Sequence, residues 1–162
     1  MSATRLNITA ICVVLVLLAI GLSASANGQA RKTATAQLRE GTVQHPLFTE
    51  YKSVRLGMTA AEARAKLGDP ALKDKDQDYY VLSDNETVQI AYNSAGKIVT
   101  ISVDFMGGVG APDPKTVVNG DLQLKPSGAL YRMVRYDAEG YWVSYNRSAG
   151  PVVVVTITLQ KL

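Results

Sequence analysis

Regular alternation of apolar and polar residues is the feature of this sequence that most constrains its fold. Strand-like residues 79–82 are followed by 87–92 (TVQIAY) and 97–105 (KIVTISVDF), with Asn-, Asp- and Gly-containing turns between them. Because successive side chains of a strand point to opposite faces of a sheet, this pattern predicts an antiparallel meander with one buried face. The residues expected on the buried face are Val88, Ile90, Tyr92, Val99, Ile101, Val103 and Phe105, and those expected to face water are Gln89, Thr100, Ser102 and Asp104.

A second set of strand patterns occupies residues 130–136, 141–145 and 152–159, again with Asp, Asn and Gly in the turns. Its last strand repeats the apolar spacing of residues 99–105 at a constant offset of 54, on Val153, Val155, Ile157 and Leu159. Since a shift by an even number of residues preserves the side on which each side chain lies, both sets are expected to bury the same face.

A helix is predicted immediately before the first set of strands. Thr59 and Glu62 have the spacing of a capping box, in which each side chain bonds the other residue's backbone N–H. Gly68 and Pro70 then end the helix. Before the second set of strands, Asp113 and Pro114 can begin only a short, degenerate helix.

These patterns predict an α+β fold of two tandem units, each a helix followed by an antiparallel β-meander, with a degenerate second helix. The expected organisation is a signal peptide at 1–26, a flexible tether at 27–50, a first unit at 51–106 and a second unit at 107–162.

The N-terminus has the pattern of a secretory signal peptide. Arg5 precedes the apolar block 8–22, and the small residues of 23–26 (SASA) follow it. A second cleavage position lies after Ala30, and the alternative interpretation is an uncleaved membrane anchor, because the uncharged stretch 8–26 is just long enough to span a bilayer. Cys12 lies inside this block, so a cleaved chain would contain no cysteine. Export without disulfides favours the bacterial periplasm or the periphery of the outer membrane.

The sequence offers little for catalysis. One histidine and one cysteine exclude Cys/His metal clusters and intrachain disulfides. His45 has no accompanying nucleophile and is interpreted as a solvated residue. Residues 74–78 (DKDQD) have the spacing of calcium ligands but lack the Gly and Glu of such loops, so the acidic residues there, Asp78 included, are interpreted as a solvated charged loop. We expect no catalytic residues, no metal and no cofactor, and a small hydrolase is disfavoured.

The charge balance also argues against nucleic acid as a ligand. The formal net charge is +3, and no clustered basic stripe is visible. A protein partner is expected instead, and the candidate partner-binding residues are Tyr131, Met133, Arg135, Trp142 and Val154, on the outward face of the second meander. Trp, Tyr and Arg are common anchors of protein interfaces. The alternative is that the tether, the first unit or the loop 112–128 covers this face.

Residues 54–70 (VRLGMTAAEARAKLGDP) resemble the G-M-T-x-x-E-V-x-x-x-L-G-x-P signature of the SmpA/OmlA family, which includes the BamE subunit of the outer-membrane β-barrel assembly machine. The matching residues are Gly57, Met58, Thr59, Glu62, Leu67, Gly68 and Pro70. The tandem arrangement is similar to the β-lactamase inhibitor protein fold. The chain departs from the family's lipoproteins in lacking a cysteine at the signal boundary.

The resemblance implies a BamE-like cell-envelope or outer-membrane assembly or integrity factor, with a protein partner in the envelope and membrane proximity. The tandem arrangement implies the alternative, a secreted inhibitor-like protein that binds an enzyme. The sequence leaves the oligomeric state open.

Overall fold

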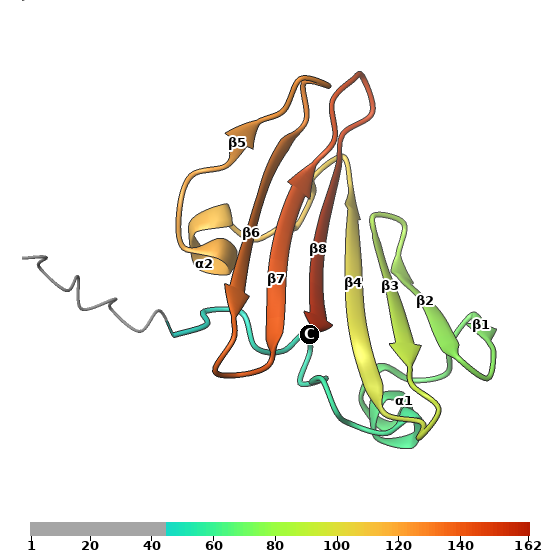
Figure 1. Cartoon of the computed structure of the whole chain (residues 1–162). Helices are drawn as coiled ribbons and strands as arrows, with labels where there is room; N and C mark the ends of the chain where they lie inside the picture. The colour runs from blue at the N-terminus through green and yellow to red at the C-terminus, as the bar shows by residue number, and fades with distance from the viewer. Residues whose placement is uncertain (1–44) are drawn as a thin grey trace, which may run out of the picture. The chain divides into compact units, whose positions relative to one another are not determined.

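The computed structural model describes residues 45–162, which form one sheet and two short helices (Figure 1). The predicted signal peptide, Cys12 and the tether up to residue 44 lie outside the described residues. The elements follow in the order α1 (Ala60–Leu67), β1 (Leu72–Lys73), β2 (Gln77–Ser83), β3 (Glu86–Tyr92), β4 (Ile98–Met106), α2 (Pro114–Val118), β5 (Gln123–Leu124), β6 (Leu130–Tyr136), β7 (Tyr141–Arg147) and β8 (Val154–Lys161).

All eight strands belong to a single antiparallel sheet with the order β1-β2-β3-β4-β8-β7-β6-β5. The expected fold class, two tandem α-then-β-meander units resembling BamE and the β-lactamase inhibitor protein, is therefore wrong. β4 and β8 pair from Thr100↔Gln160 to Met106↔Val154, so the two sets of strands join into one sheet. The two helices have only eight and five residues, and the sheet dominates the structure.

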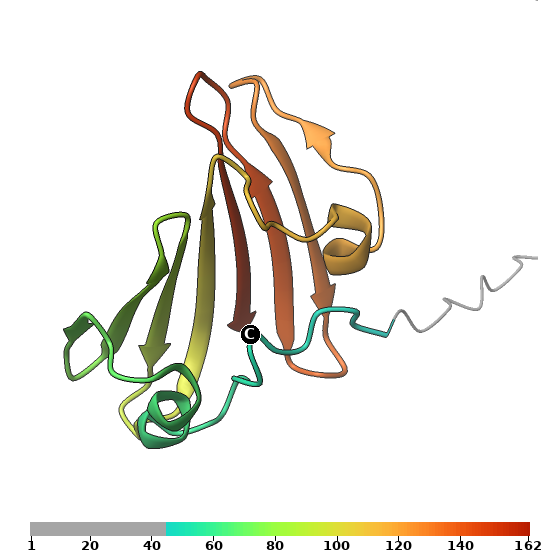
Figure 2. The same ribbon diagram turned by 180° about the vertical axis from the view of Figure 1, so that it is seen from behind.

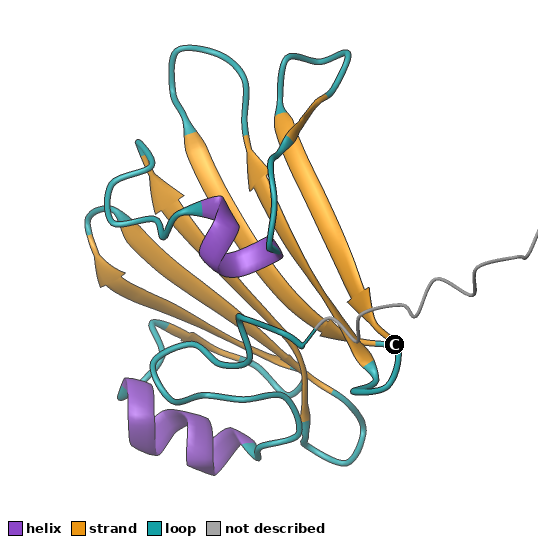
Figure 3. Ribbon diagram, turned by 90° about the vertical axis from the view of Figure 1, so that its left-hand side faces the viewer, coloured by secondary structure: helices purple, strands orange, loops and turns teal. Residues whose placement is uncertain are grey.

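The sheet has one covered and one open face. Figure 2 shows α1, α2 and the segment before α1 on the near side of the sheet. Figure 3 shows that the sheet is twisted. We call this side the covered face and the opposite side, toward the viewer in Figure 1, the open face. The core lies on the covered face, where the fully buried side chains include Val88, Ile90, Ile101, Val103, Val143, Ile157 and Leu159.

The strand patterns were predicted correctly except at Val99, which lies at a bulge, and at Val153, which precedes β8 and is only partly buried. Val88, Ile90, Tyr92, Ile101, Val103 and Phe105 are buried as expected. Val99 is only partly buried, and its neighbour Ile98 is buried instead. The register shifts there, because Tyr92 pairs with Ile98 while Ala91 pairs with Thr100, and Val99 is the extra residue of the bulge.

α1 begins and ends as the sequence predicts. The Thr59 and Glu62 side chains form the capping box, and Gly68 follows the last turn with a φ of 85°, a conformation that suits glycine. The preceding residues bond to the start of β4, since the Gly57 N–H donates to the Ile98 carbonyl and the Ile98 N–H donates to the Met58 carbonyl. Met58 and Leu67 pack against the core, so these two residues of segment 54–70 have structural roles.

A buried ion pair joins α1 to the sheet. Arg64 on α1 donates two 2.8 Å hydrogen bonds to the carboxylate of Asp78 on β2, and the Tyr92 and Tyr80 hydroxyls donate to the same carboxylate at 2.8 and 3.3 Å. The Asp78 side chain is 0% exposed. The prediction of a solvated loop is therefore wrong for Asp78, which lies on the covered face directly across from Ile90.

α2 is attached differently. Asp113 caps it and Pro114 is its first residue, as predicted, but its two valines, Val117 and Val118, are completely buried. The Arg132 guanidinium donates a 3.0 Å hydrogen bond to the Val118 carbonyl at the end of the helix. No helix among residues 45–162 has the length and apolarity needed to cross a membrane.

Candidate functional site

The open face gathers side chains from six neighbouring strands, and most of them are uncharged. Cross-strand pairing places Gln77, Tyr79, Val81, Thr87, Gln89, Ala91, Thr100, Ser102, Asp104, Met106, Val154, Thr156, Thr158, Gln160, Trp142, Ser144, Asn146, Tyr131, Met133 and Arg135 on this face. Only two of these side chains, Asp104 and Arg135, carry a charge. A surface poor in charge and rich in Tyr, Trp, Met and hydrogen-bonding groups has the composition of a protein interface.

The five residues predicted to bind a partner all lie on the open face. The predicted register of the β6–β7 hairpin is confirmed, because Arg135 pairs with Trp142 and Met133 pairs with Ser144. Tyr131 continues this row of β6, and Val154 lies on β8 opposite Met106. Met133 and Arg135 are exposed, and the other three are partly buried.

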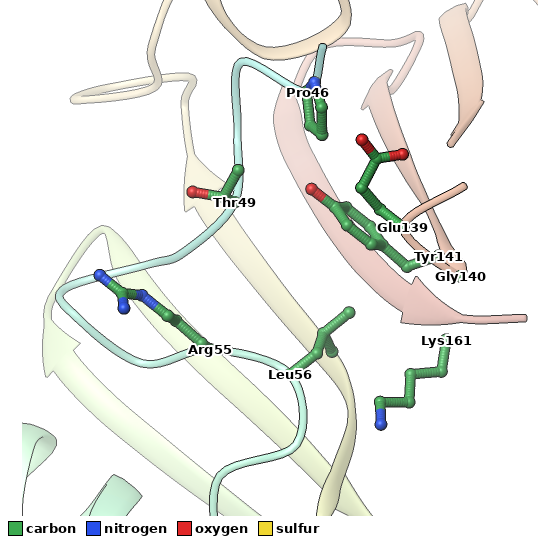
Figure 4. Close-up of a pocket in the computed structure, with 8 residues that line it drawn as sticks. All are labelled: Pro46, Thr49, Arg55, Leu56, Glu139, Gly140, Tyr141 and Lys161. Carbon is green, nitrogen blue, oxygen red and sulfur yellow. The ribbon is translucent and has the colours of Figure 1, made fainter. Parts of the chain in front are cut away.

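The loop 112–128 reaches this face at one edge, where Gln123 pairs with Tyr131 and Lys125 Nζ lies 5.0 Å from the centre of the Tyr131 ring. Its helix α2 packs on the covered face through Val117 and Val118, and the Pro112 carbonyl accepts a 3.2 Å hydrogen bond from the covered-face residue Tyr145. Residues 45–50 at the end of the expected tether also lie behind the sheet, where Pro46 approaches Tyr141 (Figure 4). The first half of the sheet lies beside the predicted face, so that the two halves form one continuous surface.

The sequence-based prediction missed the opposite edge of this surface. Tyr79 and Val81 on β2 lie on the open face, and Leu72 on β1 pairs with Tyr79. Leu72 is 69% exposed and Val81 is 58% exposed. In β2, Asp78 and Tyr80 lie on the covered face, so Tyr79 and Val81 lie on the open face. The strand was predicted to begin at residue 79, because the charged residues around Asp78 were interpreted as a loop.

Hydroxyl and amide groups fill the centre of the open face. Ser102 on β4 and Thr158 on β8 share a 3.2 Å hydrogen bond, and the Gln89 amide donates to the Gln77 side chain at 2.9 Å. Ser144 is only 6% exposed, which shows how closely its neighbours surround it. A partner covering this centre would meet many groups that can either donate or accept hydrogen bonds.

The most strongly perturbed titratable groups lie on the covered face. Burial raises the pKa of the Asp78 carboxyl, but the hydrogen bonds from Arg64, Tyr92 and Tyr80 outweigh burial and leave that pKa below its usual value. Burial and the adjacent Asp78 charge raise the pKa of Tyr80 to about 12. The cluster is closed by its own hydrogen bonds and presents no reactive group to a ligand, so it stabilises the fold.

A cavity of about 420 Å³ lies on the covered side, between the segment before α1 and the β6–β7 turn (Figure 4). Arg55, Glu139, Tyr141 and Lys161 are among its lining residues. Figure 4 shows the charged ends of Arg55 and Lys161 directed away from the Tyr141 ring, and Arg55 is paired with Glu50. Polar groups that orient a small ligand normally converge on it, and these do not.

The surroundings of His45 and the placement of possible metal ligands can be described for residues 45–162. His45 is exposed at the start of the described segment, and no three His, Cys, Asp or Glu side chains among residues 45–162 are placed to hold a metal ion.

No family model, no curated protein and no solved structure matches this chain. The open face therefore has to be interpreted from its own geometry and chemistry.

Proposed function

We propose that this chain is an exported, non-catalytic protein-binding protein of the cell envelope, and that the open face of its sheet is the binding surface. One observation carries the proposal: among the described residues no helix covers this face of the eight-stranded sheet, and its six long strands place only two charged side chains on it. Protein interfaces contain less Lys and Glu than the rest of a protein surface, and more Tyr, Trp and Met. The long strands place no Lys or Glu on this face, but they place Trp142, Tyr79, Tyr131 and Met133 there.

The cell-envelope part of the proposal is supported by sequence alone. The signal-peptide pattern of residues 1–26 and the SmpA/OmlA-like segment 54–70 favour export to the envelope. Within that setting, an assembly or integrity factor is the proposed role.

Site-specific photo-crosslinking in expressing cells tests the proposal. A photoreactive residue replaces Gln89 or Met133, which lie on opposite halves of the open face, and in matched controls it replaces Lys66 on α1 or Lys115 on α2. Both open-face positions should give an adduct with the same envelope protein, and Trp142→Ala should weaken it. Adducts formed only from Lys66 or Lys115 would contradict the proposal, because the partner would then contact the covered side.

A further inference from the structure

Asp104 is the single acidic side chain that the described strands place on the open face, and it lies near the middle of the sheet. Its strand, β4, is the central link between the two halves, and its cross-strand neighbours are Thr87 on β3 and Thr156 on β8. The Thr156 hydroxyl donates a 2.6 Å hydrogen bond to Oδ1 of Asp104. This bond fixes the carboxylate among neutral hydroxyl groups on the sheet surface.

The Asp104 carboxylate forms no ion pair with any residue from 45 to 162. Of the two cations on the same face, Arg135 is paired at 3.1 Å with Asp137 in the turn that follows β6, and Lys125 lies over the Tyr131 ring with its Nζ 5.0 Å from the ring centre. β6 is three strands away from β4 in the sheet, which corresponds to about 14 Å at the usual strand spacing. Neither cation is paired with Asp104, so among the described residues this carboxylate has no counter-ion on the open face.

This lack of a counter-ion restricts what can cover the face. A protein that docks on the centre of the sheet removes water from Asp104, and a desolvated carboxylate without a cation is strongly unfavourable. A favourable partner must therefore supply positive charge at this point. The neighbouring Thr87 and Thr156 hydroxyls can accept further N–H groups, which suits the several donors of a guanidinium.

We propose that Asp104 receives an arginine or lysine side chain of the protein partner, and that this ion pair decides which proteins the open face accepts. The inference depends on the proposed function, since it names the chemistry of the partner at that surface. The anchor is a cationic side chain at the centre of the contact, with the aromatic and apolar residues Tyr79, Met133 and Trp142 around it.

The test uses two displayed peptide libraries that are identical except for a fixed central residue, Arg in one and Gln in the other. Both are selected against the purified chain, and the affinities of the selected peptides are measured by titration. Binders should come chiefly from the Arg library, and Asp104→Asn should weaken them about 30-fold, as for the loss of one partner of a desolvated charge pair. Added salt should weaken them as well.

Two matched variants separate the charge from other effects. Asp121→Asn removes an exposed carboxylate beyond α2 and should leave affinity unchanged. Thr156→Val removes the hydrogen bond to Asp104 but keeps its charge, so the preference for the Arg library should persist. Thermal unfolding of each variant shows that the fold is retained.

The remaining outcomes each overturn a stated part. If both libraries give binders that Trp142→Ala weakens and Asp104→Asn does not, the role of Asp104 is wrong while the binding face stands. If neither library gives a binder that responds to Trp142→Ala or Asp104→Asn, the binding face itself is wrong. If sedimentation shows self-association that Asp104→Asn abolishes, a second copy of the chain occupies the face, and the inference of a different protein partner is wrong.

Discussion

α1 and α2 lie on the same face of the sheet, but different interactions attach them. α1 is rich in alanine and completely buries only Ala63, and its firmest link to the sheet is the Arg64–Asp78 ion pair. α2 is shorter and completely buries Val117 and Val118. α1 buries little apolar area and is attached by the Arg64–Asp78 ion pair, which we call the polar clamp. α2 is attached by its two buried valines. The two halves therefore differ on the covered face, whereas on the open face they form one continuous surface.

The largest expected effect comes from breaking the polar clamp. Asp78→Ala should lower the free energy of unfolding by about 3–5 kcal/mol, because it leaves Arg64 without its buried partner. Urea denaturation followed by circular dichroism measures the loss. Asp76→Ala, in the exposed loop two residues earlier, is the control and should change the free energy by less than about 0.5 kcal/mol. Equal effects of the two variants would refute the clamp.

The apolar attachment of α2 should respond to a cavity. Val117→Ala removes two methyl groups from a completely buried site and should cost about 2 kcal/mol. The same denaturation experiment measures it, with the exposed Val109→Ala as the matched control. A cost no greater than that of Val109→Ala would show that α2 contributes little to the stability of the second half.

Two buried tyrosines on the covered face, each donating one hydrogen bond, sharpen the comparison. Tyr92→Phe removes a hydrogen bond to a buried carboxylate and should cost about 2 kcal/mol, because bonds to charged groups are the stronger ones. Tyr145→Phe removes a bond to the neutral Pro112 carbonyl and should cost about 1 kcal/mol. Identical losses would mean that the charge of Asp78 does not strengthen its hydrogen bonds.

The last prediction concerns how the stabilisation by Asp78 is lost in acid solution. The pKa of Asp78 is lowered in the folded state, so its ionised form stabilises the fold at every pH above the ordinary carboxyl value. That contribution is lost as the pH falls from about 4 toward the lowered pKa. The stability advantage of wild type over Asp78→Asn should therefore be constant near neutral pH and shrink below pH 4. Parallel stability curves from neutral pH down to pH 3 would contradict this assignment.

Local features of the fold were predictable because their causes lie within a few residues. The Thr59–Glu62 capping box and the pairing of Arg135 with Trp142 both follow from short-range spacing. The pairing of β4 with β8 has no such signal, because the paired residues are far apart in the sequence and other edge strands could have paired as well. The two-residue strands β1 and β5 are too short to produce a pattern.

The candidate site was predicted in part for the same reason. Trp142 and its neighbours were found from the hairpin register, whereas Tyr79 and Leu72 complete the surface only after the first half joins the sheet. Asp78 shows the converse failure. A carboxylate among Lys73, Asp74 and Asp76 has the sequence context of a solvated loop, and only the distant Arg64 shows why it can be buried.

The shared open face is tested most directly by the affinity of the cross-linked partner for Tyr79→Ala and Trp142→Ala. These residues lie on opposite halves of the sheet, so both variants should bind at least about tenfold more weakly than wild type, as expected for aromatic interface residues. Lys66→Ala on α1 should bind like wild type. Unchanged affinity in both aromatic variants, with a loss in Lys66→Ala, would place the partner on the covered side and contradict the account.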